Sequence, residues 1–187
     1  MPSVPTSGSV PPPPPVWDAQ PPQTAVRYAG FWIRVVAAFV DAIALWIAWW
    51  FVLLILPMPP VPPMPENPDM EALLRYIQDL SSPRELVVYA VMVWAYFVFQ
   101  ESSSAQATLG KRMLGIRVSN ENGGRLSLIA ASLRAWPIYL PSLASALGVG
   151  LGAVLGLIAF VSCIAVAFSA RKQGLHDKMA GALLTRR

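Results

Sequence analysis

The class of this protein is decided by residues 30–56, which read GFWIRVVAAFVDAIALWIAWWFVLLIL. This run holds only two charged side chains, Arg34 and Asp41, and most of its other residues are apolar. A helix rises about 1.5 Å per residue, so a run of this length crosses the roughly 30 Å hydrocarbon core of a bilayer. Pro57 ends the run, because proline lacks the backbone N–H that a helix needs. We therefore predict a membrane-spanning helix over residues 30–56.

The composition of the 187-residue chain supports the same class, since 55% of its residues are hydrophobic, 13% are charged and the net charge is +4. A soluble chain of this length would leave much of that apolar surface in water, which argues against a soluble enzyme. The sequence has one cysteine, Cys163, and one histidine, His176. These counts exclude a disulfide framework, a cysteine-rich zinc site and a pair of histidine ligands. We expect no enzyme activity, no metal, no cofactor and no nucleic-acid partner.

Proline marks the domain boundary, because nine of the 19 prolines lie in the first 25 residues. A segment so rich in proline and so poor in charge cannot build a packed core. We predict that residues 1–27 form a disordered cytoplasmic tail and that residues 28–187 form one transmembrane domain. The run from Pro11 to Pro15 is interpreted as a spacer, with a docking site for a proline-binding domain as the alternative.

The segment after the first span, residues 57–82, combines a proline-rich connection with a short helix that we expect to begin at Asn67. Its apolar residues fall at helical spacing on one face: Met70, Leu73, Leu74 and Ile77. A helix of this kind lies on a membrane surface. We therefore predict an outer amphipathic helix here.

A second span is predicted over residues 83–104. Ser82 and Glu85 have the spacing of a capping box, with Pro83 at the first helical position, and residues 86–99 are continuously apolar.

The next segment changes character, because residues 112–118 alternate weakly between apolar and polar side chains and residues 120–124 form a turn cluster. We interpret residues 125–128 as a returning strand. The sequence thus predicts a small β-hairpin at the membrane surface.

Residues 128–170 carry a single charge, that of Arg134, and are long enough for two short spans. We predict these spans over residues 128–146 and 151–169. The alternative is an interfacial helix over residues 127–136 followed by one long span over residues 142–169.

The distribution of charge favours two spans here. Residues 57–84 hold four acidic residues against two arginines, whereas residues 105–127 hold four basic residues against one acid, and the segment after residue 170 holds five against one. Basic segments stay in the cytoplasm, so the hairpin and both termini face it and an even number of crossings separates them. We predict an all-α membrane protein in the bacterial cytoplasmic (inner) membrane. Its fold is a four-helix transmembrane bundle with a small cytoplasmic β-hairpin and an outer amphipathic helix.

Arg34 and Asp41 are the unusual residues of the first span, since a charge near the middle of a membrane helix costs about 2.5–3.5 kcal/mol. They lie seven residues apart, hence on one helix face and roughly 10 Å apart along the axis. Either they belong to a polar clamp between helices, or they line a path for an ion or solute. Arg134 either pairs with Asp41 or Asp177 or extends to the interface. Asp177 either makes a local salt bridge or folds back to meet Arg34.

Three stretches occur in a characteristic order: AGFWIR at 29–34 followed by Asp41, ATLGKRMLGIRV at 107–118, and LHDKMAG at 175–181. Together they resemble the RDD family of small bacterial membrane proteins, which is named after one arginine and two aspartates. The resemblance covers roughly residues 28–187 and leaves out the proline-rich tail and the extended outer loop. It implies that Arg34, Asp41 and Asp177 are the three residues of the family's name.

The resemblance implies a membrane protein of a kind for which transport of unknown ligands has been proposed, some members resembling sodium/proton antiporters. Our first hypothesis is that the protein carries or gates a cation, a proton or a small solute at Arg34, Asp41 and Asp177. Three further residues are expected beside this site: Arg134, His176 and Lys111. Besides the lipid bilayer, the expected partner is a second copy of the chain or another membrane protein. The alternative is a non-transporting structural or accessory subunit in which the charged residues only clamp the helices.

Overall fold

The computed structural model describes residues 26–56, 59–80 and 82–186. The predicted disorder of the proline-rich tail concerns residues 1–25 and therefore lies outside the described residues. The elements follow in the order α1 (Phe31–Ile55), α2 (Met70–Asp79), α3 (Pro83–Ser102), α4 (Leu109–Met113), β1 (Ile116–Asn120), α5 (Leu128–Ser145), α6 (Val149–Phe168), α7 (Leu175–Met179) and β2 (Ala182–Arg186).

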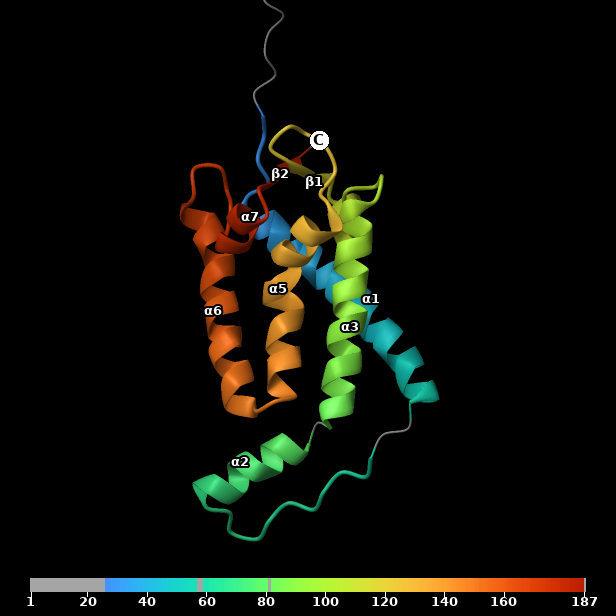
Figure 1. The fold of residues 1–187 in the computed structure, drawn as a ribbon, viewed down its shortest axis with the longest axis vertical. Coiled ribbons are helices and arrows are strands. Elements are labelled where there is room, and N and C mark those ends of the chain that lie inside the picture. The colour runs from blue at the N-terminus through green and yellow to red at the C-terminus, as the bar shows by residue number, and fades with distance from the viewer. Residues whose placement is uncertain (1–25, 57–58, 81, 187) are drawn as a thin grey trace, which may run out of the picture.

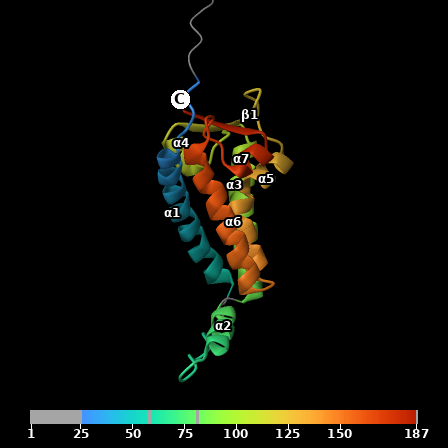
Figure 2. The same cartoon turned by 90° about the vertical axis from the view of Figure 1, so that its left-hand side faces the viewer.

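The four long helices run up and down beside one another, with α3 packed against α5 and α5 against α6 (Figure 1). Helix α1 is the most loosely held of the four, since it packs mainly on the short helix α4 and only sparsely on α6. Its buried residues within the described chain are Ala37, Asp41 and Leu45. Helix α2 lies apart, at the opposite end of the molecule from the two-stranded sheet (Figures 1 and 2).

Local capping explains where several helices begin. The Ser82 hydroxyl accepts a hydrogen bond from the backbone N–H of Glu85 at 3.3 Å, and Pro83 occupies the first turn of α3. The cap of α2 is Asp69, which accepts from the N–H of Ala72 at 2.7 Å, so the expectation that Asn67 caps this helix is wrong.

The region predicted as two short spans does contain two helices. Helix α5 ends at Ser145 and α6 begins at Val149, so the alternative with one helix over residues 142–169 is wrong. Pro137 and Pro141 lie inside α5 without ending it.

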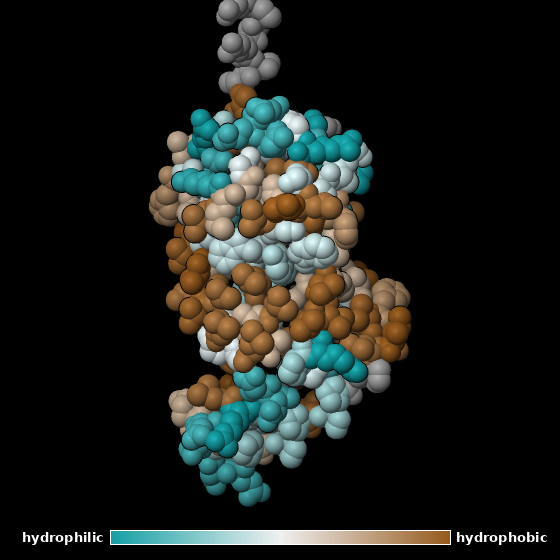
Figure 3. Space-filling view, viewed as in Figure 1, coloured by the Kyte–Doolittle hydropathy of each residue, from teal (hydrophilic) through white to brown (hydrophobic). Residues whose placement is uncertain are grey.

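The surface of the helical region is strongly apolar. Figure 3 shows brown, hydrophobic residues across the middle of the molecule and teal, hydrophilic ones at its two ends. Large apolar side chains of the long helices are exposed on this surface, for example Trp32 (77% exposed) and Phe168 (86% exposed). An apolar surface of this extent indicates contact with lipid. By length and composition α1 and α6 can each cross a membrane, and a third span results if α2 and α3 are counted as one bent helix pair. The four-span topology and the surface position of α2 stay predictions.

The small sheet differs from the predicted hairpin. Strand β1 pairs antiparallel with β2, with Ile116 opposite Arg186, and residues 125–128 form no strand. The turn after β1 does exist, since the Asn120 side chain accepts from the backbone N–H of Gly124 at 2.8 Å. The chain then leads directly into the cap of α5, where Ser127 accepts from the N–H of Ala130 at 3.1 Å. The hairpin prediction was wrong because the partner strand lies about sixty residues further along the chain.

Residues near the beginning and the end of the described chain meet at this sheet. Tyr28 forms a β-bridge with Thr185, and the backbone N–H of Ala29 donates to the carbonyl of Leu184 at 2.8 Å. Together with α4 and α7, the sheet forms a cap over one end of the long helices (Figure 1). The charged residues of the sequence analysis lie directly beneath this cap.

Candidate functional site

Asp177 is the centre of the charged cluster under the cap, and its side chain is completely buried. One carboxylate oxygen lies 2.6 Å from Nη1 of Arg34 and the other 2.9 Å from Nε of Arg134. The backbone N–H of Gly174 also donates to this carboxylate, at 3.1 Å. Asp177 thereby joins α7 to α1 and α5.

Glu101, at the end of α3, continues the network and is also completely buried. It accepts from Nη1 of Arg134 with one oxygen and from Nζ of Lys111 with the other. The ammonium group of Lys111 additionally lies 5.2 Å from the centre of the Phe97 ring. The result is a continuous ion-pair chain that links five helices through Arg34, Asp177, Arg134, Glu101 and Lys111.

Asp41 is buried nearby but has a different set of partners. Its carboxylate accepts from the Tyr96 hydroxyl at 2.7 Å, from the Thr108 hydroxyl at 2.6 Å and from the backbone N–H of Gly110 at 2.7 Å. Gly110 packs so closely on α1 that a Cβ atom there would lie 2.1 Å from the carbonyl oxygen of Ala37. Asp41 therefore fastens α3 and α4 to the middle of α1.

The structure gives Arg34 and Asp41, which the sequence places on one helix face, separate sets of partners. Arg34 makes no hydrogen bond to Asp41; its guanidinium binds Asp177, the carbonyl of Ala29 at 3.0 Å and the carbonyl of Lys172. Asp177 folds back to Arg34, and Arg134 pairs with the same carboxylate rather than with Asp41.

Glu101, Tyr96 and Thr108 were missed by sequence reasoning. Glu101 lies just after the apolar run of the second span, inside the predicted bounds of residues 83–104. The available signal was a lone carboxylate at the end of a hydrophobic helix, where burial needs a cationic partner.

His176 docks α7 onto α6. Its Nδ1 lies 2.9 Å from the Ser162 hydroxyl, and its backbone N–H donates to the same oxygen at 3.2 Å. Burial lowers the pKa of His176 to about 4, so the ring is neutral at pH 7. The Ser162 side chain is buried in this contact and does not line the cavity described below, so the pair packs α7 against α6.

The pKa values of the buried charged residues at the cap end depend on the charged side chains next to them. Burial alone would raise the pKa of Asp177, but Arg134 and Arg34 outweigh burial and lower this pKa to about 2, so the carboxylate is ionised at pH 7. Burial lowers the pKa of Lys111, and the adjacent Glu101 opposes this effect. Counting Asp41, three basic and three acidic side chains stand close together, so their formal charges cancel.

A cavity of about 170 Å³ borders the cluster. Its polar and charged lining residues are Arg34, Asp41, Lys111, Arg134 and His176. Its apolar walls are Phe31, Val35, Ala38, Phe97, Ile138, Cys163, Val166 and Leu184. All six residues named from the sequence thus lie in the ion-pair chain, in the cavity lining or in both. Across residues 26–56, 59–80 and 82–186, no group of three or more His, Cys, Asp or Glu side chains could hold a metal ion.

This geometry coincides with a sequence match. The RDD family profile covers residues 28–181, which include every charged residue of the site. The chain belongs to the RDD family. The family prediction is thereby confirmed, and with it the assignment of the chain to membrane proteins.

Two relatives of this RDD protein come from Bacillus subtilis (strain 168). "Uncharacterized protein YxaI" is 32% identical over 153 residues, which cover 80% of this chain and 91% of the relative. "Uncharacterized protein YckC" is 25% identical over 157 residues, which cover 84% of this chain and 83% of the relative. No solved structure matches the chain.

Proposed function

We propose that this RDD protein moves a small solute across the membrane by way of the cavity beside the ion-pair chain, and that the solute is an anion. The observation that carries the proposal is an excess of hydrogen-bond donors on the cavity wall. Three of the five polar lining residues are cationic, and their counter-charges Asp177 and Glu101 stand behind them rather than on the wall. The protein would act as a carrier and would catalyse no reaction.

The donors are not all used within the protein. Arg134 binds its two carboxylates through Nε and Nη1, and the hydrogen bonds among the described residues include none from its Nη2 group. Lys111 has three N–H groups, of which one is used on Glu101. A carboxylate, halide or phosphate in the cavity could accept from these groups without disturbing the ion pairs.

The acceptors, by contrast, are nearly exhausted. The two oxygens of Asp41 already accept three hydrogen bonds, which leaves little capacity to coordinate a cation. The hypothesis of a cation site at Asp41 is therefore less well supported than that of a solute bound to Lys111 and Arg134. Asp41 would hold the helices in place instead.

The size and position of the cavity suit a small ligand. At roughly 30 Å³ per water molecule, 170 Å³ holds about five waters or one small anion. The cavity lies along α1, the most loosely packed of the long helices, so a small displacement of α1 would open it. A unit of this size encloses little volume, and we propose that a complete path forms between protomers of a homo-oligomer.

We also propose the bacterial inner membrane as the location, with four crossings and with both termini and the sheet end in the cytoplasm. Two observations support this orientation: the basic segments gather at the sheet end, and the acidic segment with α2 lies at the other end (Figure 1).

The test is flux into liposomes that contain the purified full-length protein. Chloride, acetate and phosphate uptake would be compared with uptake of sodium, potassium and protons. Lys111→Gln should reduce anion uptake at least about tenfold, because it removes a charge-assisted donor from the wall. The matched control is Arg112→Gln, since Arg112 is the exposed neighbour of Lys111 and should leave uptake unchanged.

Two results would contradict the proposal. Uptake of a cation in preference to every anion would restore the cation hypothesis, with Asp41→Asn as its decisive variant. Absence of uptake for all solutes, with the protein folded, would favour the structural or accessory subunit. One observation supports this structural function. Asp41, Glu101 and Asp177 each accept hydrogen bonds from two or more donors on different helices, so each carboxylate holds helices together.

A further inference from the structure

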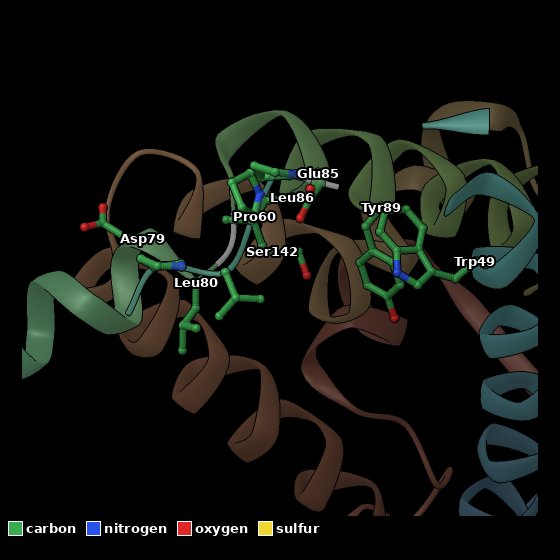
Figure 4. A pocket seen from close by; sticks show the side chains of 11 residues that line it. Trp49, Pro60, Asp79, Leu80, Glu85, Leu86, Tyr89 and Ser142 are labelled. Carbon is green, nitrogen blue, oxygen red and sulfur yellow. The ribbon is translucent and has the colours of Figure 1, made fainter. Parts of the chain in front are cut away.

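A second and larger cavity lies at the opposite end of the molecule from the ion-pair chain. Its volume is about 390 Å³, and it is bordered by the end of α1, the junction of α2 and α3, and α5 (Figure 4). The lining residues are Trp49, Pro59, Pro60, Val61, Pro62, Asp79, Leu80, Glu85, Leu86, Tyr89 and Ser142. None of them belongs to the site described above.

One end of this cavity is aromatic. Trp49 of α1 and Tyr89 of α3 lie side by side, with ring centres 5.3 Å apart and planes at 85° (Figure 4). In such an edge-to-face pair at least one ring presents its negatively polarised face to its surroundings, and this face attracts cations. Proline side chains and Leu80 make the remaining wall apolar.

The middle of the cavity holds an unsatisfied acceptor. Glu85 and Ser142 both line the cavity (Figure 4), and the Oε1 atom of Glu85 is buried without a hydrogen-bond partner among the described residues. The backbone of Glu85 is used in the helix cap, but its carboxylate does not complete a capping box. A buried carboxylate oxygen without a donor is unfavourable, so rotation of the Glu85 side chain toward a ligand N–H group in the cavity would be favourable.

The charge of the surroundings points the same way. Residues 59–86 contain five acidic residues and two arginines, and one acid, Asp79, lies at the opposite end of the cavity from Trp49 and Tyr89 (Figure 4). The resulting negative potential favours a positively charged ligand.

We propose that this cavity binds a protonated primary amine that carries an apolar or aromatic body. The ammonium group donates to Glu85 and lies against Trp49 and Tyr89, and the apolar body fills the proline-lined part. The volume falls in the range of roughly 300–1,000 Å³ that is usual for small-molecule sites. This proposal does not depend on anion transport, because it rests on other residues at the other end of the molecule.

The experiment measures binding of 2-phenylethylammonium to the full-length protein in phosphatidylcholine nanodiscs by calorimetry. We expect saturable binding that weakens at least about tenfold in Glu85→Gln, because the lost hydrogen bond is charge-assisted. Glu85→Gln keeps the backbone cap of α3, and an unchanged melting temperature without ligand establishes that the variant is folded. The matched control is Glu121→Gln, an exposed glutamate outside the cavity lining, which should change the dissociation constant less than about threefold.

Two further compounds define the chemistry. The neutral 2-phenylethanol should bind at least about tenfold more weakly than the amine, and a trimethylated ammonium analogue, which has no N–H, should also bind more weakly. Equal binding of the alcohol, or undiminished binding to Glu85→Gln, would overturn the proposal and leave an unspecific apolar cavity. The amine that binds here could be a lipid headgroup or a soluble molecule, and nanodiscs that contain phosphatidylethanolamine distinguish the two. If this lipid weakens binding of 2-phenylethylammonium, the natural ligand is a lipid headgroup. If binding is unchanged, the natural ligand is a soluble amine.

Discussion

Replacing Asp177 by Asn is the sharpest test of the ion-pair chain, because this carboxylate neutralises two arginines at once. The wild-type side chain receives charge-assisted hydrogen bonds from Arg34 at 2.6 Å and from Arg134 at 2.9 Å, and it is completely buried. Asn keeps the size but offers one carbonyl oxygen and no charge. Leaving a buried charge without its partner costs about 3–5 kcal/mol in other proteins. We expect a loss of unfolding free energy of that size.

Thermal unfolding of the purified protein in detergent measures this loss. In a chain of 150–250 residues, 1 kcal/mol corresponds to about 2–4 °C, so the melting temperature of Asp177→Asn should fall by roughly 6–20 °C. The control is Glu121→Gln, which removes the exposed ion pair between Glu121 and Arg171, whose charged atoms lie 3.8 Å apart. This change should lower the free energy of unfolding by less than about 1 kcal/mol. If both variants melt within a few degrees of the wild type, the ion-pair chain does not hold the cap on the helices.

Three further predictions follow from the same geometry. Gly110→Ala should destabilise the protein by at least about 1–3 kcal/mol, since the new methyl group would collide with the carbonyl of Ala37; the melting temperature reports this, and an unchanged value would contradict the close packing of α4 on α1. Because burial lowers the pKa of His176 from 6.5 to about 4, the stability that its neutral form contributes is complete above pH 6.5 and is lost as pH falls towards 4, up to about 3 kcal/mol. Melting curves between pH 7 and 4 check this, and His176→Asn should flatten the dependence over that interval. The topology can be tested by cysteine labelling in a background without the native cysteine. Cysteines placed at Gly123 and near the C-terminus should be labelled from one side of the membrane, and a cysteine placed at Asp79 should be labelled from the other side. Labelling of all three positions from the same side would refute the proposed topology.

Much of the helical architecture could be predicted from the sequence, because its determinants are local. Residues 30–56 predict a helix that the structure places at Phe31–Ile55, and residues 83–104 correspond to Pro83–Ser102. Apolar runs, prolines and the Ser82 cap act over a few residues and need no knowledge of the rest of the chain. The same holds for Arg34, Asp41 and Asp177 as candidates, since a charge in or beside an apolar segment is conspicuous by itself.

The partners of these charges, by contrast, were decided by the tertiary structure. Arg34 meets Asp177 across 143 positions of sequence, and Asp41, seven residues away, binds Tyr96, Thr108 and Gly110 instead. Strand β1 likewise pairs with β2 at the far end of the chain rather than with the segment after its own turn. Proximity in sequence did not decide these pairings. A buried charge or an unpaired strand edge is stable only where a complementary group reaches it, and the packing of the helices determines which group that is.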